Sequence, residues 1–207
     1  MTGKVSLGTR LYESIKAQVK SGNFCPGQPI SAAMLSKQLS ASTIPIREAL
    51  QRLVGERLVE VRDLNGFFAP HISEVGLRDL YQMQLGLLRW ILEQAPLSHQ
   101  PSLTPTLTQG AAPASMAIER LFAELADRSG NRELQWSLHN TLDRLHAACL
   151  LKEAVATDWP YECERLLAPW QHGDLAGFKQ ALQTYHDRRI ALVPALVERL
   201  NRSRTAY

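Results

Sequence analysis

The chain has 207 residues, of which 45% are hydrophobic, so it can bury a sizeable core without disulfides or metals. Its apolar runs are too short to span a membrane, no signal peptide is visible, and its three cysteines form no Cys-x-x-Cys pair. These features argue against a secreted, disulfide-rich or membrane-spanning protein. We therefore expect a cytoplasmic protein with reduced thiols and no membrane partner.

The net charge of +3 is small but unevenly distributed. Residues 1–75 hold nine Lys or Arg against six Asp or Glu, whereas residues 76–207 hold 14 of each. A local positive excess is what contact with a nucleic-acid backbone requires. The charge therefore directs attention to the N-terminal part of the chain.

Two short helices are predicted in the first 40 residues. Apolar residues at helical spacing indicate a helix over residues 7–21, and Pro26-Gly27 turns the chain after it. A second helix is predicted over residues 30–39, with Met34 on its inner face. Ser40-Ala41 then leads into a third helix, and this spacing is typical of a helix-turn-helix.

The third helix, predicted over residues 42–53, has one apolar face. Its apolar residues recur at helical spacing: Ile46, Ala49, Leu50, Leu53 and Val54. Ser42 is a suitable N-cap, and Pro45 lies in the first turn, where a missing N–H is tolerated. The residues off this face are of types that hydrogen-bond to phosphates and base edges: Thr43, Arg47, Gln51 and Arg52. An ordinary amphipathic helix with solvated charges is the alternative for this segment alone.

A β-hairpin is predicted directly after the third helix. Residues 58–62 alternate apolar and polar side chains like a strand, Asn65-Gly66 is a strong hairpin turn, and residues 67–71 return. A hairpin that follows the second helix of a helix-turn-helix is a wing.

These motifs together resemble the GntR family of bacterial winged helix-turn-helix regulators, over residues 6–75. The matching positions are Leu11-Tyr12-Glu13-Ser14-Ile15, Val19, Gly22, Pro26-Gly27, Ile30, Ser42, Pro45-Ile46-Arg47-Glu48-Ala49-Leu50, Leu53 and Gly66. The resemblance implies that the third helix enters the major groove of DNA. Its expected DNA-binding residues are Arg47 first, then Ser42, Thr43, Gln51 and Arg52 on the helix, and Arg62, Asn65 and Gly66 on the wing. Thr43 stands where many members carry a base-contacting arginine, so we expect a different operator preference.

The rest of the chain is predicted to be helical. A long apolar helix covers residues 74–95, and residues 96–115 are rich in Pro, Ser and Thr and are interpreted as a loop. Further helices are expected at 115–129, 131–156, 160–172 and 174–202, with a kink near Pro194 in the last. The expected fold is therefore mainly α. A winged helix-turn-helix over residues 1–75 precedes an all-α bundle over residues 76–207, which holds the effector and dimerisation functions.

The helical part also resembles, more weakly, the effector domain of the FadR-like branch of that family, known as the FCD type. The matching stretches are Leu125-Ala126, Ser129-Gly130-Asn131, Leu134, Leu166-Leu167-Ala168 and Gly173-Asp174. Many members bind a divalent metal there, but the four ligand positions are Ile118, Phe122, Cys163 and Tyr185 in this chain, and an effector-binding arginine is replaced by Gln84. The resemblance therefore implies no metal and no cofactor. We expect an apolar or aromatic effector, contacted by Gln84, Phe122, Trp136, Cys163 and Tyr185.

Three other patterns have competing interpretations. His139, Asp143 and His146 share one helix face and would suit a metal-dependent enzyme, although a polar stripe is the simpler interpretation. Residues 185–189 are interpreted as a helix face with solvated charges. The helical domain also has an alternative interpretation. In a regulator that binds no effector, the domain's own aromatic side chains would fill the expected pocket.

From these patterns we predict a sequence-specific DNA-binding transcription regulator and not an enzyme. It is expected to act as a repressor and as a homodimer on a pseudo-palindromic operator in double-stranded DNA. A small molecule in the helical domain would change the affinity for DNA by shifting a pre-existing equilibrium.

Overall fold

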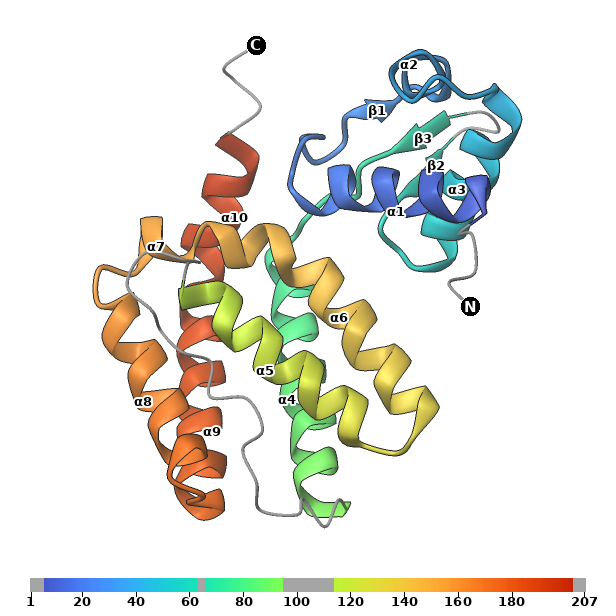
Figure 1. Cartoon of the computed structure of the whole chain (residues 1–207). Coiled ribbons are helices and arrows are strands. Elements are labelled where there is room, and N and C mark those ends of the chain that lie inside the picture. Colours follow the sequence, from blue (N-terminus) through green and yellow to red (C-terminus); the bar gives the residue numbers. More distant parts are fainter. Residues whose placement is uncertain (1–5, 63–65, 95–113, 203–207) are drawn as a thin grey trace. The chain divides into compact units, whose positions relative to one another are not determined.

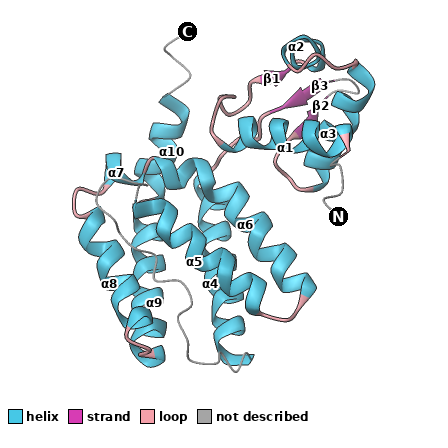
Figure 2. Cartoon of the chain, viewed as in Figure 1, coloured by secondary structure: helices cyan, strands magenta, loops and turns pink. Residues whose placement is uncertain are grey.

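A computed structural model describes residues 6–62, 66–94 and 114–202 of the chain. It contains two compact units: Met1–Ile72 with Leu200–Tyr207, and Ser73–Arg199 (Figure 1). Each unit has its own hydrophobic core. The structure is mainly helical with one small sheet, as the sequence predicts (Figure 2).

The first unit is a winged helix-turn-helix. Its helices are α1 (Leu7–Lys20), α2 (Ala32–Gln38) and α3 (Thr43–Gly55), and its strands are β1 (Pro29–Ile30), β2 (Glu60–Arg62) and β3 (Gly66–Phe68). The core contains Leu11 and Ile15 of α1, Leu35 of α2, and Leu50 and Leu53 of α3. The apolar faces that predict these helices therefore pack together in the core of the helix-turn-helix.

The sheet has one strand more than the predicted hairpin. Its order is β1-β3-β2 and both pairings are antiparallel, with Ile30 opposite Phe67 and Val61 opposite Phe67 on the other side. Ile30 was expected in the second helix, but Ser31 caps that helix by accepting a hydrogen bond from the Met34 backbone N–H. Helix α2 therefore starts at Ala32, and Ile30 is extended and buried. The expectation that Met34 faces inward is also wrong, because its side chain is 72% exposed.

Helix α3 ends in a Schellman motif. The Arg57 N–H donates to the Val54 carbonyl, and the Leu58 N–H donates to the Leu53 carbonyl, both at 3.0 Å. Arg57 has a φ of 57°, in the left-handed region where glycine is the usual residue. At the other end Ser42 is the N-cap residue, but its hydroxyl makes none of the expected capping bonds within the described chain.

The second unit is a bundle of helices. They are α4 (Glu74–Gln94), α5 (Ala114–Arg128), α6 (Arg132–Leu150), α7 (Lys152–Val155), α8 (Trp159–Gln171), α9 (Leu175–Ala191) and the larger part of α10 (Val193–Arg202), which the first unit shares from Leu200 on. Helix α4 packs against α5, α6 and α9, and α8 packs against α5 and α9. The core between them is formed by aliphatic and aromatic side chains, including Leu88, Phe122, Trp159 and Phe178.

Two predicted helices are interrupted in the structure. The helix expected over 131–156 breaks at Leu151, between α6 and α7, and the helix expected over 174–202 breaks at Leu192, two residues before Pro194. The loop interpretation of residues 96–115 falls almost entirely outside the described residues. Among the helices that the structure describes, none combines the length and apolarity needed to cross a membrane.

Candidate nucleic-acid interface

The outer face of α3 carries the residues predicted to contact DNA. Ile46, Ala49, Leu50 and Leu53 are buried, as the helical spacing predicts. The five predicted contact residues on this helix are all exposed: Ser42, Thr43, Arg47, Gln51 and Arg52. The structure therefore gives this unit a polar helix face that is free for a ligand.

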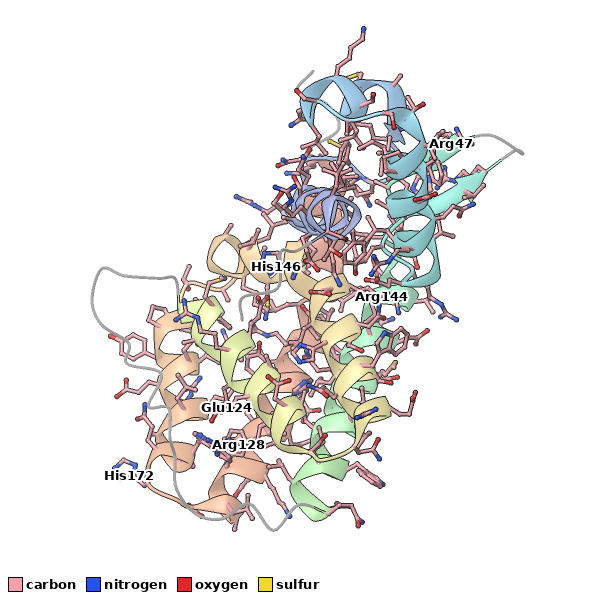
Figure 3. All side chains as sticks on the ribbon, turned by 45° about the vertical axis from the view of Figure 1, so that its right-hand side comes forward. Arg47, Glu124, Arg128, Arg144, His146 and His172 are labelled. Carbon is pink, nitrogen blue, oxygen red and sulfur yellow. The ribbon has the colours of Figure 1, made fainter. Side chains whose placement is uncertain are left out.

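Aromatic rings position the two arginines of α3 differently. The Arg47 guanidinium lies 5.6 Å from the centre of the Phe67 ring, so it is directed toward the β-hairpin (Figure 3). The Arg52 guanidinium lies 3.9 Å from the ring centre of Tyr12, so it is directed toward α1. Arg47 is therefore the better placed of the two for a groove that receives both α3 and the wing.

The wing arginine is already paired. Arg62 donates to the Glu60 carboxylate through Nε at 3.2 Å and Nη2 at 2.7 Å, and its guanidinium lies 5.2 Å from the centre of the Phe68 ring. Gly66 is the first residue of β3, and a Cβ there would lie 2.5 Å from the Phe68 ring. A larger residue at this position would therefore require the Phe68 ring to shift. Asn65 lies outside the described residues.

Two exposed residues of α3 were missed in the sequence analysis. Ile44 is 69% exposed at the start of the helix, and Glu48 is exposed one turn later. An apolar side chain can contact a thymine methyl group, and a carboxylate can accept from cytosine N4. Ile44 is a large apolar residue that lies outside the apolar spacing of α3. This mismatch could have identified it from the sequence as an exposed residue.

Comparison with known proteins identifies this unit. Residues 7–69 match the family model described as bacterial regulatory proteins of the gntR family. This match shows a GntR-type domain over residues 7–69.

Individual relatives agree with that match. It is 25% identical over 155 residues to the HTH-type transcriptional regulator YdhC of Bacillus subtilis, covering 69% of each chain. It is 33% identical over 136 residues to the HTH-type transcriptional regulator McbR of Escherichia coli, which is 64% of this chain and 57% of McbR. The solved structure of E. coli McbR/YncC has the same fold, with a TM-score of 0.70 at 23% identity over 93% of this chain and 99% of that one.

The interior of the helical unit contains a buried lysine. Lys152, at the start of α7, is 1% exposed, and its Nζ donates to Tyr185 Oη and contacts Cys149 Sγ, both at 2.7 Å. The same nitrogen lies 5.2 Å and 5.3 Å from the ring centres of Trp159 and Tyr185. A signal for it existed, because Lys152 continues the apolar spacing of Leu138, Leu142, Leu145 and Cys149 into what was expected to be one helix.

Residues 185–189 do not form the solvated face that was expected. Tyr185, His186 and Arg189 are all buried on the inner side of α9, at the spacing of Phe178 and Leu182. Arg189 donates to the buried Glu162 carboxylate. Burial lowers the pKa of His186 to about 3, so this imidazole is neutral at physiological pH.

The expected effector residues are only partly brought together. Gln84, Phe122 and Tyr185 line one interior cavity, which also contacts Cys149 and Lys152. Cys163 is fully buried in the same core. Trp136 was wrongly included, because it lies on the outer side of α6 and is 56% exposed.

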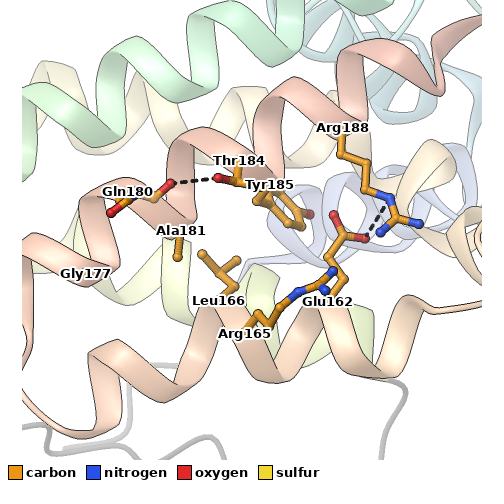
Figure 4. Close-up of a pocket in the computed structure, with 9 residues that line it drawn as sticks. All are labelled: Glu162, Arg165, Leu166, Gly177, Gln180, Ala181, Thr184, Tyr185 and Arg188. Carbon is orange, nitrogen blue, oxygen red and sulfur yellow. Dashed lines mark hydrogen bonds and ion pairs between the residues drawn. The ribbon is translucent and has the colours of Figure 1, made fainter.

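Two hollows in the described part of the helical unit both differ from the expected apolar pocket. The interior cavity has a volume of about 10 Å³, and charged or polar groups of Lys152, Glu119 and Tyr81 line it. A larger groove of about 320 Å³ lies between α8 and α9 (Figure 4). Its arginines are directed toward carboxylates, since Arg188 and Arg165 both approach Asp158 and Arg188 also lies 3.8 Å from Glu162.

The histidines of α6 are engaged separately. His139 Nε2 lies 2.8 Å from Asp127 Oδ1, and His146 Nδ1 lies 2.9 Å from Glu119 Oε2. Burial acts to raise the pKa of Glu119, but the hydrogen bond from His146 and neighbouring charges outweigh it and leave the pKa lowered. Within the described residues no three His, Cys, Asp or Glu side chains are grouped to hold a metal ion, which removes the support for the enzyme hypothesis built on this stripe.

Proposed function

We propose that this chain is a GntR-family regulator that contacts operator DNA through the outer face of α3 and the adjoining hairpin. The observation that carries the proposal is the exposed row on α3, with Arg47 next to Phe67 on the wing side. Arg47 would hydrogen-bond to a guanine edge or a phosphate, and Ser42, Thr43 and Gln51 would contact the same groove. Arg52 and Arg62 would contact the phosphate backbone, from the α1 side and from the wing. The relatives named above are all transcription regulators, which supports a regulator over an enzyme.

The test of this surface is the substitution Arg47→Ala. We expect the variant to fold normally and to lose about 1–3 kcal/mol of binding free energy for its operator, the range for one base-contacting arginine. The operator would first be selected from random duplexes with the purified wild-type protein. Arg132→Ala is the matched control, because it removes an exposed arginine from the helical unit. Equal affinities of wild type and Arg47→Ala in a filter-binding assay would remove Arg47 from the interface.

We further infer that the unit Ser73–Arg199 is an effector-domain homologue of the FCD type and forms a homodimer. The outer face of α4 supports this, because three large apolar residues are exposed along it: Val75, Met83 and Trp90. An exposed apolar row on one helix is typical of a surface that another chain covers. Two copies would then present two winged helices to a pseudo-palindromic site. Repression is the proposed outcome, as in the E. coli protein named transcriptional repressor GlaR, which is 32% identical over 76 residues, or 37% of this chain and 34% of GlaR.

The interior cavity favours the alternative in which no effector binds there. Small-molecule pockets usually measure roughly 300–1,000 Å³, whereas the interior cavity measures about 10 Å³. The groove between α8 and α9, at about 320 Å³, reaches this range, but its arginines are already directed toward carboxylates. We therefore expect no rise in the melting temperature of the helical unit when aromatic acids and amines are added, and unchanged operator affinity. A ligand that binds only the folded state must raise the melting temperature. A saturable rise with any of these compounds would contradict the effector-independent function and support the effector-dependent one.

A further inference from the structure

Cys149 and Lys152 form a contact in the helical unit that the functions above do not use. Cys149 lies near the end of α6 and Lys152 starts α7, three residues later, so their side chains share one face. The distance between Lys152 Nζ and Cys149 Sγ is 2.7 Å, and both residues are buried. The hydrogen bond from Nζ to Tyr185 Oη keeps the nitrogen at this position.

The same two side chains line the interior cavity. Its volume of about 10 Å³ is close to the space that one water molecule needs. The Tyr81 hydroxyl, which is buried and has no hydrogen-bond partner among the described residues, also lines it and can donate to a bound oxygen atom. Glu119 lines the cavity too and can accept a proton. Hydrogen peroxide, which is small, neutral and polar, therefore needs only a slight enlargement of this cavity, whereas a bulky disulfide needs a much larger one.

We propose that Cys149 and Lys152 form a modification site, at which hydrogen peroxide oxidises the thiol and the lysine nitrogen then binds the sulfur as a sulfenamide. In the first step Sγ attacks a peroxide oxygen. The S–O bond forms, the O–O bond breaks, and one water leaves a sulfenic acid. In the second step Nζ, after giving its ammonium proton to the Glu119 carboxylate that lines the same cavity, attacks Sγ. The S–N bond forms, the S–O bond breaks, and hydroxide leaves with the amine proton as a second water.

This reaction balances with one equivalent of peroxide. The sulfur loses two electrons and the peroxide gains them, so that thiol, amine and peroxide give the sulfenamide and two waters. Groups held within about 3–3.5 Å in a fixed geometry react as if at very high concentration, which favours capture by Lys152 over further oxidation. Burial raises the pKa of the Cys149 thiol to about 11, so the thiolate is scarce and the reaction is slow at neutral pH.

Peptide mapping of the full-length protein tests the proposal. The protein is treated with hydrogen peroxide, denatured, alkylated and digested with trypsin, which normally cleaves after Arg144, Lys152 and Arg165. We expect an uncut peptide 145–165 that lacks two hydrogens and carries no alkyl group on Cys149. Treatment with a thiol reductant should restore cleavage after Lys152. Because the readout is a covalent mass, it does not depend on DNA binding.

Cys163 provides the control, because it lies in the same peptide and is also buried. A disulfide between Cys149 and Cys163 would also remove two hydrogens, but it would leave Lys152 open to trypsin. In the Cys163→Ala variant the uncut peptide should persist, and in Cys149→Ala it should disappear. Cleavage after Lys152 with Cys149 alkylated, or with Cys149 carrying only added oxygen atoms, would overturn the proposal.

Discussion

Arg189 and Glu162 form an ion pair that solvent does not reach. Arg189 is fully buried, its guanidinium lies 4.8 Å and 5.0 Å from the ring centres of Trp159 and Tyr185, and Glu162 is its carboxylate partner. Two of its nitrogens, Nε and Nη1, have no hydrogen-bond partner among the described residues. A pair with incomplete hydrogen bonding gains little over an apolar pair of the same volume, but either charge alone would be very unfavourable.

Substitutions of this pair should therefore be strongly non-additive. Glu162→Gln leaves the Arg189 charge uncompensated and should lower the free energy of unfolding by about 3–5 kcal/mol. The double variant Glu162→Met/Arg189→Met should recover most of that loss. All four tryptophans lie in the helical unit, so urea unfolding followed by tryptophan fluorescence reports this unit alone. A double variant that is less stable than Glu162→Gln would contradict this account.

At the scale of elements, the spacing of apolar residues predicts most of the structure. Helices α1, α3 and α4 end within about two residues of their predicted limits, a usual uncertainty for helix ends. Spacing did not predict the break at Leu151, because no Gly or Pro marks it. The interruption turns Lys152 into the start of α7, beside Tyr185. Spacing also did not predict β1. This strand has only two residues, too few for an alternating pattern, and it forms by pairing with the distant strand β3.

The candidate site was predictable to a similar extent and for the same reason. The exposed face of α3 follows directly from its buried face, so the candidate contact residues on that helix could be named from sequence. The interior of the helical unit could not, because its polar members come from α4, α5, α7, α8 and α9 and meet only after folding. Helical spacing shows that Arg189 is on the Phe178 face, but it cannot show that Glu162 lies opposite.

The end of α3 provides a prediction about an element. Arg57 holds a left-handed conformation that is unfavourable for a residue with a Cβ, so Arg57→Gly should stabilise the first unit by about 0.5–1 kcal/mol. Arg57→Ala is the matched control, since it removes the charge and keeps the strain. Amide hydrogen exchange of α3 in the full chain measures the difference. Equal protection in the glycine and alanine variants would show that the conformation of Arg57 is not under strain.

At the scale of the whole molecule, the exposed row on α4 predicts a dimer. Light scattering should give twice the chain mass for the wild type, and the double variant Met83→Glu/Trp90→Glu should be a monomer because it places charges in an apolar interface. Trp136→Glu is the control, since it changes another exposed tryptophan, which lies on α6. A monomeric wild type, or a dimer lost only in Trp136→Glu, would rule out the α4 face.

The missing side-chain cap at Ser42 has a consequence for how the protein binds DNA. The first turn of α3 lacks the side-chain acceptor that Ser31 supplies to α2 and Asn131 supplies to α6. A phosphate oxygen at that helix end would accept from the same backbone N–H groups and would also be favoured by the helix dipole. A DNA phosphate would thus supply the capping acceptor for the helix that enters the groove. Part of the order of the protein–DNA complex would then come from the nucleic acid itself.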